Sequence, residues 1–449
     1  MKPNILLITI DSLKADKIYG PDKSSVTPNI DSLMNNGKYF SQAISTSDST
    51  GLSIGSLITS KYPFNTGITH FSYEPTTDTH FDILKNNDYK IYATIPDSSF
   101  FLKMSANFSK VDAYVYDKRE SWLQLTGGIG KQIVERLTSN MVEPWVYFIH
   151  LMDLHAPFYI PREFDSEKFG KTKYDRMVSA IDFWIGKFLE KIDLTQTLII
   201  ISADHGDYIP IVQDWGETPK VNALLKKGKE KLPGLEPVGL RLFVGYQSLK
   251  NKYKSKKLSK NLSEREFLAL QGRGQSHLFD ELIRIPLIFS GYGINSSQII
   301  SNQVKQIDIF PTIFDILKIP TLSNIDGQSL IPLFNNEPFK EIPAYIETGT
   351  RNIKNSKNPT LYGKIIGVRT SKYKYWRSRF DSKQNLTLYD LETDPKEEKN
   401  IAEINPEIIN SMEEILSNLK KNSIELLTNE FSKEDENTIE EELKKLGYL

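Results

Sequence analysis

Residues 45–63 read STSDSTGLSIGSLITSKYP, and the character of the chain changes once within them. Ser45 to Gly51 is made of small or hydroxyl-bearing residues apart from Asp48, which predicts a polar, flexible loop. From Leu52 onward, small and apolar residues recur at helical spacing until Tyr62-Pro63 ends the run. The free N–H groups at the start of such a helix can bind an anion or a developing negative charge. An ordinary Ser/Thr N-cap is the alternative for this stretch taken alone.

Apolar runs on either side of this stretch predict the strands of a large sheet. Ile5 to Ile10 and Thr197 to Ile201 are the clearest, and an acid follows each run. Further strands are expected at 89–95, 145–149 and 285–289, and helices after Thr27, at 175–192, at 308–317 and at 327–334. The alternation predicts an α/β sheet with helices on both faces, whose ligands gather at the carboxyl ends of the strands. The polar residues that follow predicted strands should therefore share one rim: Asp11, His150, Asp153, His155, Asp204 and His205.

The composition and the predicted secondary structure of the chain change at two further points. Residues 208–273 are rich in lysine and predict an inserted cap or lid, with a solvated surface excursion as the alternative. From about residue 342, short strands at 344–347, 364–370, 373–377 and 386–389 predict a small antiparallel sheet, followed by helices at 406–419 and 433–449. We therefore expect a catalytic domain over 1–340 and a C-terminal α+β subdomain over 341–449.

Composition excludes several classes of function. A net charge of −1 over 449 residues gives no reason to expect nucleic-acid binding. The absence of cysteine excludes disulfides, thiolate zinc sites and a cysteine nucleophile. No apolar run is long enough for a signal peptide or a membrane span, so a cytoplasmic location is expected. The lysines of the insert leave peripheral contact with a membrane surface open, and the sequence does not indicate an oligomeric state.

Three residues of the predicted rim have the character of metal ligands. Asp11, Asp204 and His205 offer hard oxygen donors and an imidazole, which suit Mg²⁺, Mn²⁺, Zn²⁺ or Ca²⁺. The hydroxyl of Thr50 beside such an ion would be a metal-bound, activated nucleophile. Helix capping and ion pairing are the structural alternatives for each acid taken alone.

Ordered matches along the chain resemble the sulfatase family of the alkaline phosphatase superfamily. They are PNILLITIDSLKAD, SLITSKYP, HLMDLHAPF, SADHGD, SHLFDELIRIPLIFSG and LYDLETDPKEEKNIA. The resemblance implies an alkaline-phosphatase-like fold: a large mixed, mostly parallel sheet flanked by helices, with a small antiparallel subdomain. It implies metal ligands at Asp11, Asp204 and His205, a nucleophile at Thr50, and substrate-contacting histidines at His155 and His277.

The departures from that family bear on the chemistry. Thr50 stands where sulfatases carry the cysteine or serine that becomes formylglycine, and residues 50–54, TGLSI, lack the Cys/Ser-x-Pro-x-Arg signature. Because its Cβ bears a methyl group, threonine cannot form that aldehyde. Ile54 replaces the supporting arginine, and Ser12 replaces a second aspartate. A threonine is similar to the nucleophile of the phosphodiesterase and phosphotransferase branches of the superfamily.

The leading prediction is therefore a metal-dependent hydrolase that acts on phosphate esters through Thr50, with His155 or His277 assisting. Asp153 and His70 are further candidates for substrate contact, and a second metal could be held among His150, Asp153, His155 and His277. The alternatives are a sulfuric ester hydrolase, a phosphoethanolamine- or phosphoglycerol-type transferase, and a catalytically silent polyanion-binding protein. The expected substrate is a phosphate or sulfate ester of a small molecule, lipid or glycan.

Overall fold

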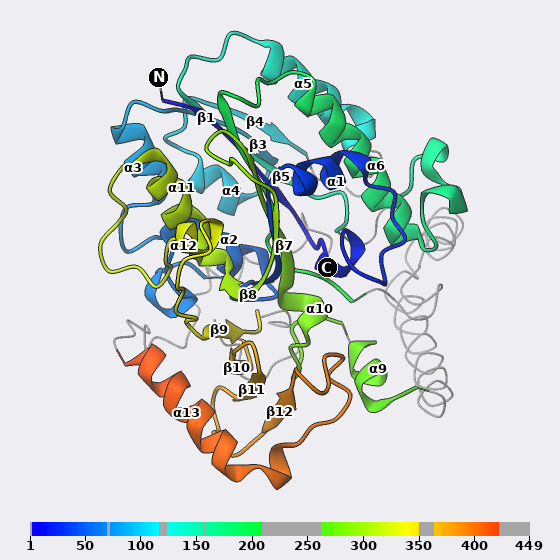
Figure 1. Cartoon of the computed structure of the whole chain (residues 1–449), viewed down its shortest axis with the longest axis vertical. Coiled ribbons are helices and arrows are strands. Elements are labelled where there is room, and N and C mark those ends of the chain that lie inside the picture. The colour runs from blue at the N-terminus through cyan, green and yellow to red at the C-terminus, as the bar shows by residue number, and fades with distance from the viewer. Residues whose placement is uncertain are drawn as a thin grey trace, which may run out of the picture.

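A large central sheet dominates the computed structural model of the protein, which describes residues 2–69, 72–115, 124–155, 159–208, 262–270, 272–349 and 363–421 (Figure 1). The sheet has eight strands in the order β4-β3-β5-β1-β6-β7-β2-β8. The strands are β1 (Asn4–Ile10), β2 (Lys38–Ile44), β3 (Lys90–Pro96), β4 (Lys110–Tyr114), β5 (Trp145–Leu151), β6 (Thr197–Ala203), β7 (Arg284–Gly291) and β8 (Gln298–Lys305).

Most neighbours in this sheet run parallel. β1 pairs in parallel with β5 and β6, and only β7 runs antiparallel to its neighbours β6 and β2. The three central strands are buried along their whole length, which explains why they read as unbroken apolar runs. The predicted mixed, mostly parallel sheet is confirmed.

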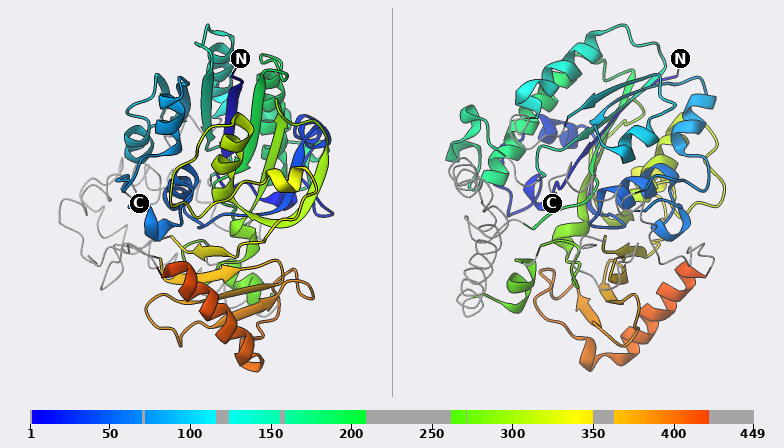
Figure 2. Two further views of the ribbon diagram at one scale, coloured as in Figure 1. Left: turned by 60° about the vertical axis from the view of Figure 1, so that its left-hand side comes forward. Right: turned by 180° about the vertical axis from the view of Figure 1, so that it is seen from behind.

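Helices cover both faces of the sheet (Figures 1 and 2). On one face α1 (Pro28–Asn35) and α5 (Gly130–Thr138) pack against α6 (Lys173–Leu189). On the other, α2 (Thr50–Thr59) packs against α3 (His80–Asn86) and α11 (Ile309–Leu317). The remaining described helices are α4 (Ser99–Met104), α9 (Glu264–Ala269), α10 (Asp280–Ile283), α12 (Ile331–Phe334) and α13 (Pro406–Lys420).

A second, smaller sheet lies beyond one end of the large one (Figure 1). It is antiparallel, with the order β12-β11-β10-β9, and α13 packs against β10. Its strands are β9 (Ala344–Glu347), β10 (Ile365–Arg369), β11 (Tyr373–Ser378) and β12 (Thr387–Asp390). The predicted small antiparallel sheet and the helix after it are confirmed, whereas the exact domain boundaries stay a prediction.

Two predicted segments lie largely outside the described residues. They are the lysine-rich insert, of which 209–261 and residue 271 are outside, and the terminal helix at 433–449. The role of the insert as a lid therefore stays a prediction. Within the described part of the chain, no helix combines the length and apolarity that crossing a membrane requires.

Candidate metal and nucleophile site

The site begins where three central strands end level with one another. In the register of the sheet, Ile10 of β1 lies opposite Leu151 of β5 and Ala203 of β6. Asp11 and Asp204 come next on β1 and β6, so they emerge side by side at the carboxyl edge of the sheet. Both side chains are fully buried. This is the position at which open α/β sheets carry their ligands.

Each acid has one carboxylate oxygen fixed by a protein donor. The hydroxyl of Ser12 donates to Asp11 Oδ1 at 2.6 Å, and the amides of Ser12 and His205 donate to Asp204 Oδ1 at 3.1 and 2.7 Å. Ser12 reaches both acids because its φ of 63° turns the chain sharply after the strand. Asp204 Oδ2 is buried and makes no hydrogen bond with any part of the chain that the structure describes. A buried carboxylate oxygen that has no hydrogen-bond partner is typical of a residue that binds a metal ion.

The ring of His205 completes this group. Its Nδ1 lies 2.7 Å from the carbonyl oxygen of Gly206, which favours the proton on Nδ1 and leaves the lone pair on Nε2. Nε2 lies 3.4 Å from Asp204 Oδ2. One ligand atom from each of Asp11, Asp204 and His205 lies within 4.8 Å of the others, and no second group of this kind occurs among the described residues. The donor set fits a divalent cation.

Thr50 lies beside the same three residues. It is the first residue of α2, and its Oγ1 is 3.1 Å from Asp11 Oδ2 and 3.3 Å from His205 Nε2. The structure thus brings together all four residues that the sequence suggested as metal ligands or nucleophile.

Two serine hydroxyls fix Thr50 relative to the metal-ligand turn. Ser45 donates to the carbonyl oxygen of Asp204 at 2.6 Å, and Ser53 on α2 donates to the same oxygen. The two serines also lie 2.9 Å apart, Oγ to Oγ. Residues 45–49 form the predicted polar loop before α2, but they are buried throughout. The hydroxyl of Ser45 is hydrogen-bonded inside the protein, whereas those of Thr46 and Ser47 make no hydrogen bond with the described residues.

The electrostatics of the two acids differ. Burial raises the pKa of Asp204, and the negative charge of Asp11 raises it further. Burial also acts to raise the pKa of Asp11, but the charges of His155, His205 and Arg273 hold it well below its usual range. Two buried carboxylates this close repel one another, and a divalent cation between them would relieve that repulsion.

The histidines of the neighbouring strand occupy different surroundings. His155 is buried, and its charge lowers the pKa of Asp11 more than any other charge does. Asp153 accepts a hydrogen bond from the Leu125 amide at 3.1 Å, and burial raises its pKa to about 7. His150 lies within β5 rather than after it, which corrects the expectation, and its Nδ1 is 2.8 Å from Thr9 Oγ1.

The other predicted histidines are dispersed. His277 is buried, with its ring 5.5 Å from the rings of both Tyr208 and Phe279. His70 lies outside the described residues. The polar residues before His80 in the sequence suggest a loop, but the structure corrects this interpretation. His80 is the buried first residue of α3, and its ring stacks on that of Phe310 with a centroid distance of 5.0 Å.

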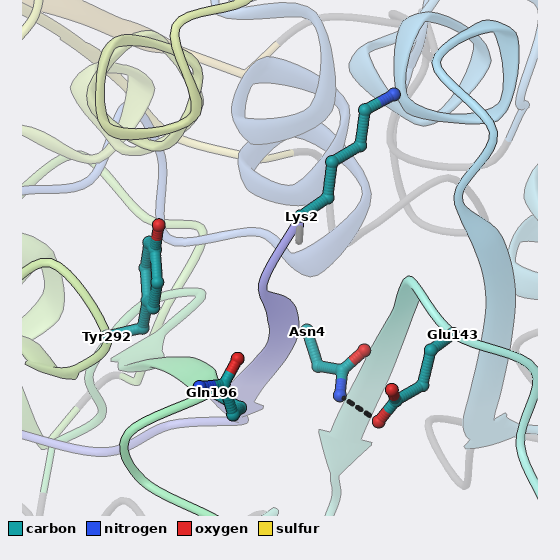
Figure 3. Close-up of a pocket in the computed structure, with 5 residues that line it drawn as sticks. All are labelled: Lys2, Asn4, Glu143, Gln196 and Tyr292. Carbon is teal, nitrogen blue, oxygen red and sulfur yellow. Dashed lines mark hydrogen bonds between the residues drawn. The ribbon is translucent and has the colours of Figure 1, made fainter.

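A hollow at the opposite edge of the sheet does not belong to this site (Figure 3). Its lining residues are Lys2, Asn4, Glu143, Gln196 and Tyr292. Asn4 is the first residue of β1, so the hollow lies at the amino end of the strand whose carboxyl end leads to Asp11. The side-chain Nδ2 of Asn4 donates to Glu143 Oε1 at 2.8 Å. Its lining contains none of the metal-ligand candidates.

Residues 3–319 match the family model described as Sulfatase. The chain belongs to the sulfatase family. A second model, described as N-sulphoglucosamine sulphohydrolase, C-terminal, matches residues 274–426. The resemblance predicted from the sequence is confirmed over most of the chain.

Known members of this family share segments or the fold with the chain. Human arylsulfatase K is 30% identical over 151 residues, a match that spans 32% of this chain and 26% of that protein. The crystal structure of Ps i-CgsB in complex with k-i-k-neocarrahexaose has a TM-score of 0.66 at 18% identity and covers 100% of both chains. That of the phosphonate monoester hydrolase of Agrobacterium radiobacter has a TM-score of 0.66 at 15% identity, covering 97% of this chain and 99% of that one. At these identities the structural matches show the shared fold.

The sequence did not single out Arg273 or Asp48. Arg273 Nη1 lies 2.6 Å from His205 Nε2, and the carboxylate of Asp48 accepts hydrogen bonds from the Gly274 and Gly349 amides at 2.8 and 2.6 Å. One signal was present in the sequence: Gly272-Arg273-Gly274 places a cation in a glycine-flanked turn just before the predicted His277. Nothing local to Asp48 indicates its two distant partners.

Proposed function

We propose that this sulfatase-family protein is a metal-dependent hydrolase of phosphate esters that uses Thr50 as its nucleophile. One observation carries the proposal: Thr50 Oγ1 lies 3.1 Å from Asp11 Oδ2 and 3.3 Å from His205 Nε2, inside the group that fits a divalent cation. If Thr50 only capped α2, its hydroxyl would accept a hydrogen bond from a backbone amide of that helix. The side chain of the N-cap residue, Ser49, forms no such capping hydrogen bond.

The chain's own residues fit the steps of such a reaction. A divalent ion held by Asp11, Asp204 and His205 would act as a Lewis acid, lowering the pKa of the nucleophile and neutralising charge on the transferred group. Thr50 Oγ1, having lost its proton to solvent, would attack phosphorus, and the bond from phosphorus to the alcohol oxygen would break. His155 would give that oxygen its proton. Burial lowers the pKa of His277 to about 4, so His277 would assist as a neutral hydrogen-bond donor. Water would then cleave the phosphothreonine and restore the hydroxyl.

A sulfate ester is the second candidate substrate. The relatives favour it, since they include human arylsulfatase K and a protein whose structure contains D-glucosamine-2-N,6-O-disulfate. The phosphonate monoester hydrolase among the structural neighbours favours the phosphorus ester. Thr50 supports the latter, because threonine cannot form formylglycine. An ester carried by a small molecule or a glycan suits either chemistry. Transfer to an acceptor, lipid esters and a cytoplasmic location stay predictions.

The test compares substrates, metals and variants in one assay. Purified protein is freed of metal with EDTA and supplied with Mg²⁺, Mn²⁺, Zn²⁺ or Ca²⁺, then assayed on aryl phosphate, aryl phosphodiester and aryl sulfate. We expect metal-dependent phosphate ester hydrolysis that falls by roughly 10³-fold or more in Thr50→Ala. Thr50→Ser, which keeps the hydroxyl, should retain much of the activity.

Thr138→Ala is the control variant. Thr138 lies in α5, and its hydroxyl donates to the carbonyl groups of Val134 and Glu135 in the same helix, so its removal should leave the rate unchanged. Full activity in Thr50→Ala would contradict the nucleophile assignment. Faster turnover of the sulfate than of either phosphate would favour the second candidate, and full activity in EDTA would exclude a metal-dependent reaction.

A further inference from the structure

A buried glutamine connects the metal-ligand turn to the helix that carries the nucleophile. Gln306 is the first residue of the 3-10 turn η6 (Gln306–Asp308), which follows β8, and it is fully buried. Its Nε2 donates to the carbonyl oxygen of Ala203 at 2.8 Å and to that of Asp204 at 3.3 Å. Its Oε1 lies 2.8 Å from the hydroxyl oxygen of Ser53. One carboxamide therefore bridges the end of β6 and α2.

The peptide group that joins Asp204 to His205 is held at both of its polar ends. Its N–H donates to Asp204 Oδ1 at 2.7 Å. Its carbonyl oxygen accepts from Gln306 and from the hydroxyls of Ser45 and Ser53. A buried peptide that is bonded in this way cannot rotate without leaving polar groups unpaired. The network therefore fixes the peptide that lies between two metal-ligand candidates.

The same network determines where the nucleophile lies. Ser53 follows Thr50 by three residues in α2, so the two side chains are neighbours on one face of the helix. A bond that fixes Ser53 therefore also fixes the turn of α2 that carries Thr50. The turn η6 is itself held in place, because the buried carboxylate of Asp308 accepts the amide of Lys305 at 2.7 Å.

We propose that Gln306 is a positioning residue, which sets the distance between Thr50 Oγ1 and the metal ligands through its bonds to Ser53 and to the Asp204 carbonyl. It acts through these residues and not on the reacting atoms. This inference rests on the proposed function, because the distance affects a rate only if Thr50 reacts beside a bound ion.

Steady-state kinetics on an aryl phosphate at saturating Mn²⁺ provide the first test. Gln306→Met keeps the length of the side chain and removes both polar atoms. We expect kcat to fall by roughly 10- to 100-fold while KM changes by less than about threefold, because a displaced nucleophile slows the chemical step more than it weakens substrate binding. Ser53→Ala removes the same contact from the side of the helix and should reproduce the effect, including in the event that Gln306→Met does not fold.

Gln303→Met is the matched control. Gln303 lies three positions earlier, is also buried, and uses both carboxamide atoms, which bond to the carbonyl and the guanidinium of Arg369 at 2.9 and 2.6 Å. These bonds join β8 to the small sheet and do not involve the metal-ligand turn. Gln303→Met should therefore destabilise the protein without changing kcat. A similar loss of kcat in both variants would show that each acts through stability, and would overturn the inference.

A second test needs no turnover, because the chain contains no cysteine. Thr50→Cys introduces a single thiol, whose thiolate can bind Co²⁺ only if residue 50 lies within bonding distance of the ion. Thiolate binding produces a charge-transfer absorption band and a higher Co²⁺ affinity. We expect Thr50→Cys to bind Co²⁺ at least about tenfold more tightly than Thr50→Ala, and this advantage to shrink to about threefold or less when Gln306→Met is added. Addition of Gln303→Met should leave the advantage intact.

The two tests separate this inference from the proposed function. If the protein hydrolyses no ester, or if hydrolysis persists in Thr50→Ala, the proposed function fails, and the Co²⁺ titration still measures whether Gln306 positions residue 50. An undiminished Co²⁺ advantage in the presence of Gln306→Met would overturn the inference. A diminished advantage with normal kcat would also overturn it. No advantage of Thr50→Cys in the protein that retains Gln306 would refute both proposals, because residue 50 would then lie away from the ion.

Discussion

His80 is a buried histidine whose protonation state affects the stability of the folded protein. Its ring stacks on Phe310, meets Phe314 edge-on and places Nε2 2.8 Å from the hydroxyl of Ser60 at the end of α2. Burial, together with the smaller effect of the Lys61 charge, lowers the pKa of His80 to about 3. The folded protein therefore holds this imidazole neutral in a range where the unfolded chain would protonate it.

The buried, neutral imidazole of His80 makes the stability of the folded protein depend on pH. Between the folded pKa of about 3 and an unfolded value near 6.5, the unfolded chain binds the extra proton, so stability rises with pH across this window. Lowering the pH from 7 to 5 should cost about 2 kcal/mol from this residue. Urea unfolding of His80→Gln at both pH values should show a smaller loss than the unsubstituted protein by about that amount. An equal loss in both proteins would show that the pKa of His80 is the same in the folded and unfolded states.

At the residue scale, the sequence predicted Asp11 and Asp204 as metal-ligand candidates because each follows an apolar strand. Thr50 was identified as the nucleophile position through the resemblance to the sulfatase family. Arg273 and Asp48 could not be found in this way, since their meaning lies in partners more than 60 positions away in the chain. The buried surroundings of His80 are also set by the distant helix α11.

At the scale of elements, Asp48 connects three separate segments around the nucleophile. It belongs to the loop before α2. Its two carboxylate oxygens accept hydrogen bonds from the backbone amides of Gly274, beside Arg273, and of Gly349, just after β9. Both bonds are charge-assisted, and Gly349 lies so close that a Cβ there would meet Ser49 Cβ at 2.5 Å. The loop, the turn after the insert and the edge of the small sheet are therefore held together by one carboxylate.

Asp48→Ala should loosen all three segments at once. We expect it to lower the free energy of unfolding by about 2–4 kcal/mol and to weaken substrate binding, because both amides lose a charged acceptor. Asp48→Asn keeps one carbonyl oxygen and should lose less. Chemical denaturation and KM measure the two effects. An Asp48→Ala protein with normal stability and normal KM would show that the two amides are satisfied without this side chain.

The strands that the sequence did not predict share one property. β2, β4 and β8 each mix polar and apolar residues, and β4 and β8 form the two edges of the large sheet, where one side of the strand faces no partner. An apolar run marks a strand buried on both faces, so the central strands β1, β5 and β6 were predicted and these were not.

At the scale of the whole molecule, a buried ionic cluster joins the two sheets. Asp280 on α10 pairs with Arg369 of β10 at 2.8 Å and with Lys374 of β11 at 2.9 Å, and Lys374 also pairs with Glu397 at 2.7 Å. The side chain of Lys374 is fully buried. Such a cluster is costly to desolvate, but removing one member leaves the others as uncompensated charges.

Asp280→Asn should therefore destabilise the protein by about 3–5 kcal/mol, measured by denaturant unfolding. Glu392→Gln is the control, because Glu392 pairs with Lys372 on the surface and both side chains are about half exposed, so little change is expected. If Asp280→Asn unfolded at the same denaturant concentration as the control, the ion pairs of Asp280 would contribute nothing measurable to holding the two sheets together.

Asp48 accepts hydrogen bonds from Gly274 and Gly349, which lie 226 and 301 positions further along the chain, and this has a consequence for the order of assembly. Because synthesis runs from the N-terminus, the strands that precede Asp11 and Asp204 exist before Gly274 and Gly349 have been added. A growing chain would thus display its cation ligands well before it could hold an ester against them. Activity would appear only after the small sheet has packed against the large one. Enzyme activity, followed during refolding, should therefore lag behind the recovery of secondary structure.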